Sequence, residues 1–171
     1  MLNVVRLYIK FITAINRALF YCAASLMAIV VPVMMYEVVS RYVFHAPTVW
    51  GMELAVLLFG PYFLFGGPYL LHLGGHVNLD LFRRRLSEKP GRLLDSFNQI
   101  VIMTFCVILL VYSFPLAMQS MGFRETSFSA WNPPLWPYKF AVPLAVLLLA
   151  LQSLAELALL WIDQDRKEGA V

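Results

Sequence analysis

The chain has 171 residues, of which 61% are apolar and only 13% are charged, and its mean hydropathy is +0.73. A water-soluble domain of this size carries about 25% charged residues, so this composition argues against a soluble enzyme. The high apolar and aromatic content also excludes a disordered chain. The length fits about four membrane-spanning helices of roughly 20 residues each, joined by short connections.

Four stretches that are almost free of charge are each long enough to cross a hydrocarbon core of about 30 Å. They predict an all-α membrane protein with a single membrane domain over residues 1–171, because backbone in lipid must satisfy its own hydrogen bonds. The expected spans cover approximately residues 18–40, 52–72, 94–121 and 138–162. Cys22 and Cys106 fall inside these stretches, so we expect core thiols there and no disulfide or metal site.

Lysine and arginine are distributed unevenly between the two sides that these four spans define. Ten of them lie before the first span, between the second and third spans, or after the fourth. The opposite side carries only three, which are Arg41, Arg124 and Lys139. The positive-inside rule therefore predicts that both termini lie in the cytoplasm.

Two short segments, approximately 2–17 and 77–88, are predicted to be amphipathic and to lie at the cytoplasmic surface. In the first, Arg6, Lys10 and Arg17 recur at helical spacing on a polar side. The opposite, apolar side contains Val5, Tyr8, Ile12 and Ile15. The alternative for this segment is a simple helical extension of the first span. In the second segment, three consecutive arginines are expected to lie among lipid phosphates.

A few charged residues lie at or inside the expected spans. Glu37 and Arg41 are four residues apart, which brings them together on one face of a helix. Glu53 begins the second span just after Trp50. Glu156 lies inside the fourth span, where a carboxylate should face protein or water. We interpret it as a hydrogen-bonding group that positions one helix against another or against a partner, with a proton or ion relay as the alternative.

The three histidines allow a second hypothesis of a different class. His45, His72 and His76 could act as ligands in a haem-binding membrane anchor of a respiratory oxidoreductase. The intervening glycines weaken the pairing of His72 with His76, and His45 is expected on the opposite side of the membrane. The chain contains no catalytic motif, so we expect no enzyme activity and no cofactor or metal.

Several motifs together resemble the small permease subunit of TRAP (tripartite ATP-independent periplasmic) transporters, the DctQ-like family. An Arg-Tyr plus aromatic pattern ends the first span at Arg41–Phe44, and a Trp followed by Glu-Leu begins the second at Trp50–Leu54. The second span is followed by the element His76–Asp80 and then by a basic amphipathic segment. The resemblance covers about residues 15–162, although Met52 stands where the family often has a second acid.

The resemblance implies a role as a scaffold subunit of an ion-driven importer of organic acids in the bacterial inner membrane. The implied partners are a large permease subunit, which would form a stable complex with this chain, and a periplasmic binding protein, which would bind transiently. Sodium is the implied driving ion. On this hypothesis, the candidate structural and partner-contact residues are Arg41, Trp50, Glu53, His76, Asp80 and Glu156.

Overall fold

The computed structural model describes residues 2–73 and 87–168, and within these ranges it is built of four long helices. They are α1 (Leu2–Tyr42), α2 (Gly51–His72), α4 (Glu88–Gly122) and α5 (Trp136–Glu168). Each helix is long and apolar enough to cross a membrane. The predicted all-α fold with four membrane-spanning helices is therefore confirmed. Each expected span lies within one of the helices, although the membrane boundaries themselves stay predictions.

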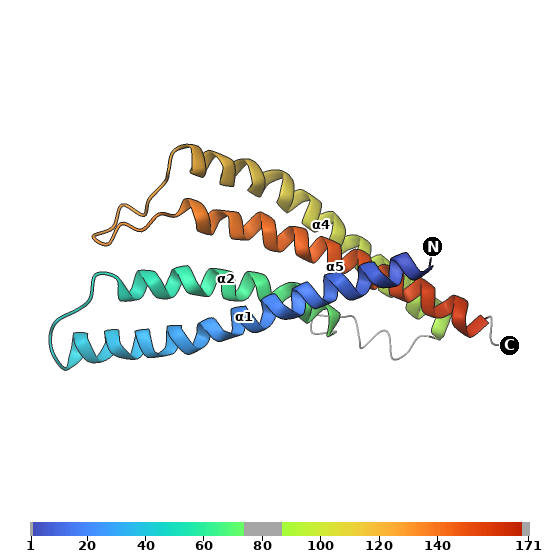
Figure 1. Cartoon of the computed structure of the whole chain (residues 1–171), viewed down its shortest axis with the longest axis horizontal. Helices are drawn as coiled ribbons and strands as arrows, with labels where there is room; N and C mark the ends of the chain where they lie inside the picture. Colours follow the sequence, from blue (N-terminus) through green and yellow to red (C-terminus); the bar gives the residue numbers. More distant parts are fainter. Residues whose placement is uncertain (1, 74–86, 169–171) are drawn as a thin grey trace.

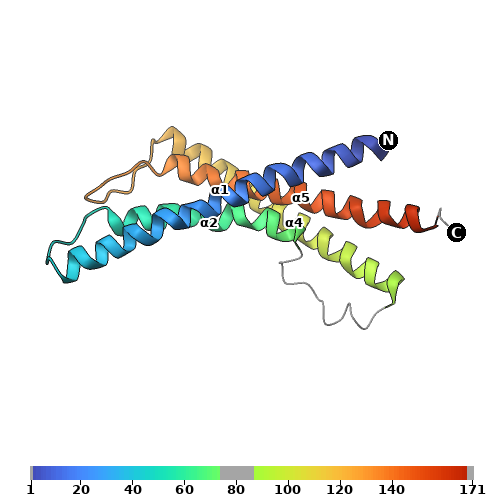
Figure 2. The ribbon, with the colours of Figure 1, turned by 60° about the horizontal axis from the view of Figure 1, so that its bottom comes forward.

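The helices form two antiparallel pairs, α1 with α2 and α4 with α5 (Figure 1). Helix α5 is central because it contacts α1, α2 and α4. The two pairs meet along α5, which contacts both α2 and α1, and they separate toward the end that carries the loops 43–50 and 123–135 (Figures 1 and 2). We call this end the loop end. Both termini lie at the opposite end, which we call the termini end.

Helix α1 is continuous over 41 residues, from the first turns to the loop end. At about 1.5 Å per residue it is roughly 60 Å long, twice the thickness of a hydrocarbon core of about 30 Å. The predicted amphipathic segment 2–17 is therefore the first part of the same helix, and its position at the membrane surface stays a prediction. The second predicted segment, 77–88, lies almost wholly outside the described residues.

Small side chains fill the contacts between the helices. Ala23, Ala55, Ala145 and Ala155 are at most 3% exposed, so the backbones can approach one another closely. Cys106 is fully buried, as expected, whereas Cys22 is exposed. The expectation of a core thiol at Cys22 was wrong because the neighbouring Ala23 marks the packed face of α1 and turns residue 22 outward.

Ala155→Leu tests whether α5 is the centre of the bundle. Ala155 is fully buried, so the larger side chain should destabilise the fold by about 1–3 kcal/mol through overpacking. The measurement is thermal unfolding in one detergent, followed by far-UV circular dichroism. Leu154→Ala is the control because Leu154 is 41% exposed on the same helix. Equal melting temperatures for the two variants would contradict the central position of α5.

Candidate functional site

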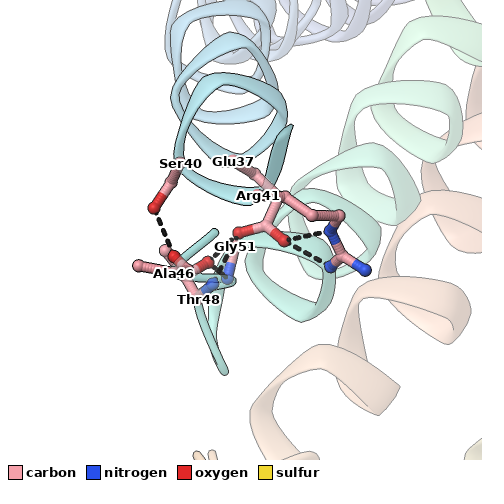
Figure 3. A network of polar contacts seen from close by, with 6 residues as sticks. All are labelled: Glu37, Ser40, Arg41, Ala46, Thr48 and Gly51. Carbon is pink, nitrogen blue, oxygen red and sulfur yellow. Dashed lines mark hydrogen bonds and ion pairs between the residues drawn. The ribbon is translucent and has the colours of Figure 1, made fainter. Parts of the chain in front are cut away.

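A buried carboxylate organises the loop end of the first helix pair. Glu37 is only 2% exposed, and its Oε1 accepts hydrogen bonds from Arg41 Nε at 3.0 Å and from Arg41 Nη2 (Figure 3). Its Oε2 accepts from the backbone N–H of Thr48 at 3.1 Å and from the Thr48 hydroxyl. Two acceptor oxygens are thus shared among four donor groups. Because the guanidinium also balances the charge, Glu37 can remain ionised in its buried position.

The same carboxylate sets the start of α2. Thr48 Oγ1, which donates to Glu37, accepts the backbone N–H of Gly51 at 3.1 Å. One residue before Arg41, the hydroxyl of Ser40 donates to the carbonyl of Ala46 (Figure 3). The loop 43–50 is therefore closed by side chains of the last turns of α1. We call Glu37, Ser40, Arg41, Ala46, Thr48 and Gly51 the outer network.

The predicted residues Trp50 and Glu53 lie beside the outer network and make different contacts. The ring of Trp50 stacks on Tyr36, with centroids 6.1 Å apart. Glu53 Oε2 accepts the hydroxyl of Ser129 at 2.6 Å, which joins the first turn of α2 to the loop between α4 and α5. Arg41 is bonded to Glu37, so Arg41 and Glu53 support two separate connections at the loop end.

The loop 123–135 is also held by a bond within itself and by a bond to the first turn of α5. The backbone N–H of Leu135 donates to the Glu125 carbonyl at 2.8 Å, and the Lys139 ammonium donates to the Glu125 carboxylate. The hydrogen bond from Lys139 lowers the pKa of Glu125 below its ordinary value. The carboxylate therefore stays charged at pH values where an ordinary glutamate begins to protonate.

A second set of polar contacts lies toward the termini end, where α1 crosses α5. The amide of Gln152, which is fully buried, accepts from Asn16 Nδ2 at 2.8 Å and donates to Glu156 Oε1 at 2.8 Å. Gln152 Nε2 also lies 3.3 Å from Thr13 Oγ1. Gln152 thus connects α1 with the carboxylate in α5.

This set extends to the two remaining helices. His72 Nδ1, at the last residue of α2, lies 2.6 Å from Glu156 Oε1. The Ser153 hydroxyl donates to Gln99 Oε1 of α4 at 2.8 Å. All four helices are therefore joined by side-chain hydrogen bonds near one level of the bundle. We call this set the polar layer, and its members are Thr13, Asn16, His72, Gln99, Gln152, Ser153 and Glu156.

The two polar sets are separated by about the thickness of a hydrocarbon core. On α1, Asn16 and Glu37 are 21 residues apart, which is about 32 Å along the axis. On α2, Glu53 and His72 are 19 residues apart, which is about 29 Å. A hydrocarbon core is about 30 Å thick, so the separation of the two sets matches this thickness, and their position at its two boundaries stays a prediction. Glu156, which contacts the last residue of α2, belongs to one of these levels.

The structure brings some predicted site residues together and separates others. Arg41, Trp50 and Glu53 lie at the loop end, and Glu156 lies in the polar layer about 30 Å away along α2. His76 and Asp80 lie outside the described residues. Glu37 is the residue whose role the sequence understated, because the i, i+4 spacing identified its partner Arg41 but could not show that it also binds Thr48.

The positions of His45 and His72, the two described histidines, argue against an iron bound by both, as the haem-anchor alternative would allow. His45 lies in the loop 43–50, whereas His72 ends α2, and the 22 residues of that helix separate their levels by about 33 Å. One iron cannot be bound by ligands so far apart. Within the described part of the chain, no group of three or more His, Cys, Asp or Glu residues could hold a metal ion.

Comparison with known proteins gives the family. Residues 29–163 match the model of the DctQ component of tripartite ATP-independent periplasmic transporters. The chain therefore belongs to this family and is a TRAP transporter small permease subunit, a transporter component and not an enzyme. The family and the four apolar helices make it a multi-pass inner-membrane protein.

Two curated relatives are similar to parts of the chain. One is the sialic acid TRAP transporter permease protein SiaT of Haemophilus influenzae, which is 26% identical over 98 residues. These residues are 57% of this chain and 16% of that relative. The other is the sialic acid TRAP transporter small permease protein SiaQ of Vibrio cholerae, 27% identical over 99 residues. They are 58% of this chain and 57% of that relative, so neither match spans two thirds of the relative's length.

Gly51→Ala tests the outer network. A Cβ at this position would lie 2.7 Å from Thr48 Oγ1 and 3.1 Å from Glu37 Oε2, so the hydroxyl that joins the loop to α2 must move. We expect a loss of about 1–3 kcal/mol, measured as a lower melting temperature. Gly60→Ala on the same helix is the matched control, since nothing lies within 4 Å of its added Cβ. If Gly51→Ala is as stable as Gly60→Ala, the outer network does not fix the start of α2.

Substitutions of Glu156 distinguish helix positioning from proton relay. Glu156→Gln keeps an oxygen that accepts from Gln152 and His72, so stability and uptake by the assembled transporter should stay close to those of the parent. Glu156→Leu removes the acceptor and should destabilise the fold by about 1–3 kcal/mol. A Gln variant that is stable but inactive in uptake would instead favour the relay.

Proposed function

We propose that this subunit is a fixed scaffold for a large permease subunit and that it helps to receive a periplasmic binding protein. The observation that carries this proposal is the use of the polar side chains. At both levels the described carboxylates are bonded to groups of the same chain, as in Glu37 with Arg41 and Thr48, and Glu156 with His72 and Gln152. Such groups hold helices in place, which suits a scaffold.

The outer surface of the bundle supports a role within a larger complex. Helix α4 has many exposed apolar side chains, including Phe97, Phe105 and Tyr112 at 62%, 57% and 74% exposure. Four helices of this kind are too few to form a transport pathway by the usual inverted-repeat arrangement. The similarity of this chain to 16% of the SiaT permease protein is further support, because there the matched region is part of a much longer chain.

The proposed orientation in the membrane is based on the distribution of charge. Both termini lie at one end of the bundle, and the uneven distribution of lysine and arginine supports the proposal that this end faces the cytoplasm. The loop end, with the outer network and the loop 123–135, then faces the periplasm, where a binding protein would dock. Organic acids are the proposed cargo, since both relatives are named for sialic acid, and an ion gradient, of sodium on the family resemblance, is the proposed driving force.

Reconstitution tests this function. The tagged chain, expressed with the large permease subunit of its own host, should co-purify with it in mild detergent. Proteoliposomes that contain both subunits should take up an organic acid when the binding protein and an inward sodium gradient are supplied. Either subunit alone should show no uptake. Uptake by this chain alone would overturn the scaffold role.

The variant Arg41→Ala, with Arg124→Ala as control, tests whether the outer network supports assembly with the large permease subunit. Both arginines are exposed at the loop end, but Arg41 also binds the buried Glu37. We expect Arg41→Ala to lower the yield of the two-subunit complex and Arg124→Ala to leave it unchanged. Equal yields for both variants would show that the outer network does not support assembly.

A further inference from the structure

The first turns of α1 are held in a defined rotation about the helix axis. The hydroxyl of Tyr8 donates to the carbonyl of Leu151 in α5 at 2.9 Å. Ile9 and Ile12 are 7% and 6% exposed, and Asn16 is bonded to Gln152. This side of α1 is therefore its protein-packed face. The sequence assigned Tyr8 and Ile12 to the apolar side of an amphipathic segment, and the structure packs both against the bundle.

With the packed face fixed, a second apolar face is directed outward. Val4, Leu7 and Phe11 are spaced by three and four residues, so they lie on one side of the helix. Their exposed fractions are 71%, 69% and 63%. Figure 2 shows α1 diverging from α5 toward the N-terminus, and the high exposed fractions show that the described helices leave this outward face uncovered.

The basic residues form a third face beside the exposed apolar one. Arg6, Lys10 and Arg17 are spaced by four and seven residues and are all exposed. The sequence contains no acidic residue before Glu37, so the first 36 residues carry only positive side-chain charge. We call Arg6, Lys10 and Arg17 the basic face.

We propose that the first four turns of α1 bind anionic phospholipid of the cytoplasmic leaflet. Val4, Leu7 and Phe11 enter the acyl region, and the basic face contacts the phosphates. A phospholipid carries an apolar acyl chain next to a negatively charged headgroup. These two parts match the exposed apolar face and the basic face, which also lie next to each other. The helix continues about 20 Å beyond Asn16, so it must lean into the headgroup layer to keep its apolar face out of water.

This inference rests on the proposed orientation, which sets the leaflet, but not on the proposed transport function, since it concerns lipid and not the partner subunits. The structure also adds a point that the sequence did not predict, the attachment of this segment to the bundle. The helix is attached to the bundle through Tyr8 and Asn16, so lipid bound to its outward faces acts on the same helix that enters the polar layer.

Lipid selectivity is the first test. The full chain is reconstituted in phosphatidylcholine vesicles, and the fraction of motionally restricted lipid is measured by electron paramagnetic resonance with spin-labelled phosphatidylglycerol or phosphatidylcholine. We expect about a three- to tenfold preference for phosphatidylglycerol, weakened by salt. The variant R6Q/K10Q/R17Q should lose most of it. The charge-conserving variant R6K/R17K and the loop-end variant R124Q should keep it.

The outcomes separate lipid from a protein partner. A triple variant with unchanged phosphatidylglycerol preference would overturn the proposal. If the triple variant keeps its lipid preference but no longer co-purifies with the large permease subunit, the basic face is a protein contact and the proposal is also wrong. Circular dichroism should show the same helix content in all variants, since the three side chains lie off the packed face.

Depth in the bilayer is a second test, in which the label at position 7 leaves the basic face unchanged. A spin label at Leu7→Cys, in a background with Cys22→Ser and Cys106→Ser, should collide more with oxygen than with a water-soluble nickel chelate. A label at Arg6→Cys should show the reverse. If the label at position 7 is as accessible to the chelate as the label at position 6, the helix projects into water and the proposal fails.

Discussion

Hydrogen bonds between helices at the polar layer are the interaction on which the arrangement of this molecule depends. Lipid tails are as apolar as leucine, so burial of leucine between helices gains little over contact with lipid, and association relies on packing and on polar contacts. Gln152 provides both an acceptor for Asn16 and a donor for Glu156. Its amide therefore fixes where α1 crosses α5, and Glu156 adds α2 to the same level through His72.

At the loop end, the outer network holds the loop that connects α1 to α2, whereas the polar layer holds the point where α1 crosses α5. Glu37 holds the loop 43–50 by binding Thr48, and Thr48 in turn binds Gly51 at the start of α2. The first helix pair is thus fixed at both ends. The second pair is joined to it at the loop end by Glu53 and Ser129, and at the polar layer through α5.

The sequence was sufficient for the fold class because charge-free length is a strong signal in a chain that is 61% apolar. The sequence was less informative about which face of each helix packs in the bundle. Cys22 was expected inside, and Tyr8 with Ile12 was assigned only to an apolar side of the first segment, because periodicity distinguishes polar from apolar faces but not protein from lipid. The pairing of Glu156 with His72 was also hidden, since the two are 84 residues apart and no local spacing connects them.

The spacing of the two polar sets has a consequence for the host membrane. Carboxylates and amides fixed about 30 Å apart on rigid helices cannot adjust their separation when the bilayer changes. In lipids with longer acyl chains, hydrophobic mismatch would draw one set into hydrocarbon unless the helices become more upright. In thinner bilayers, apolar turns would meet water unless the tilt increases. We therefore expect the tilt of the subunit to depend on the thickness of the surrounding bilayer as well as on its own hydrogen bonds.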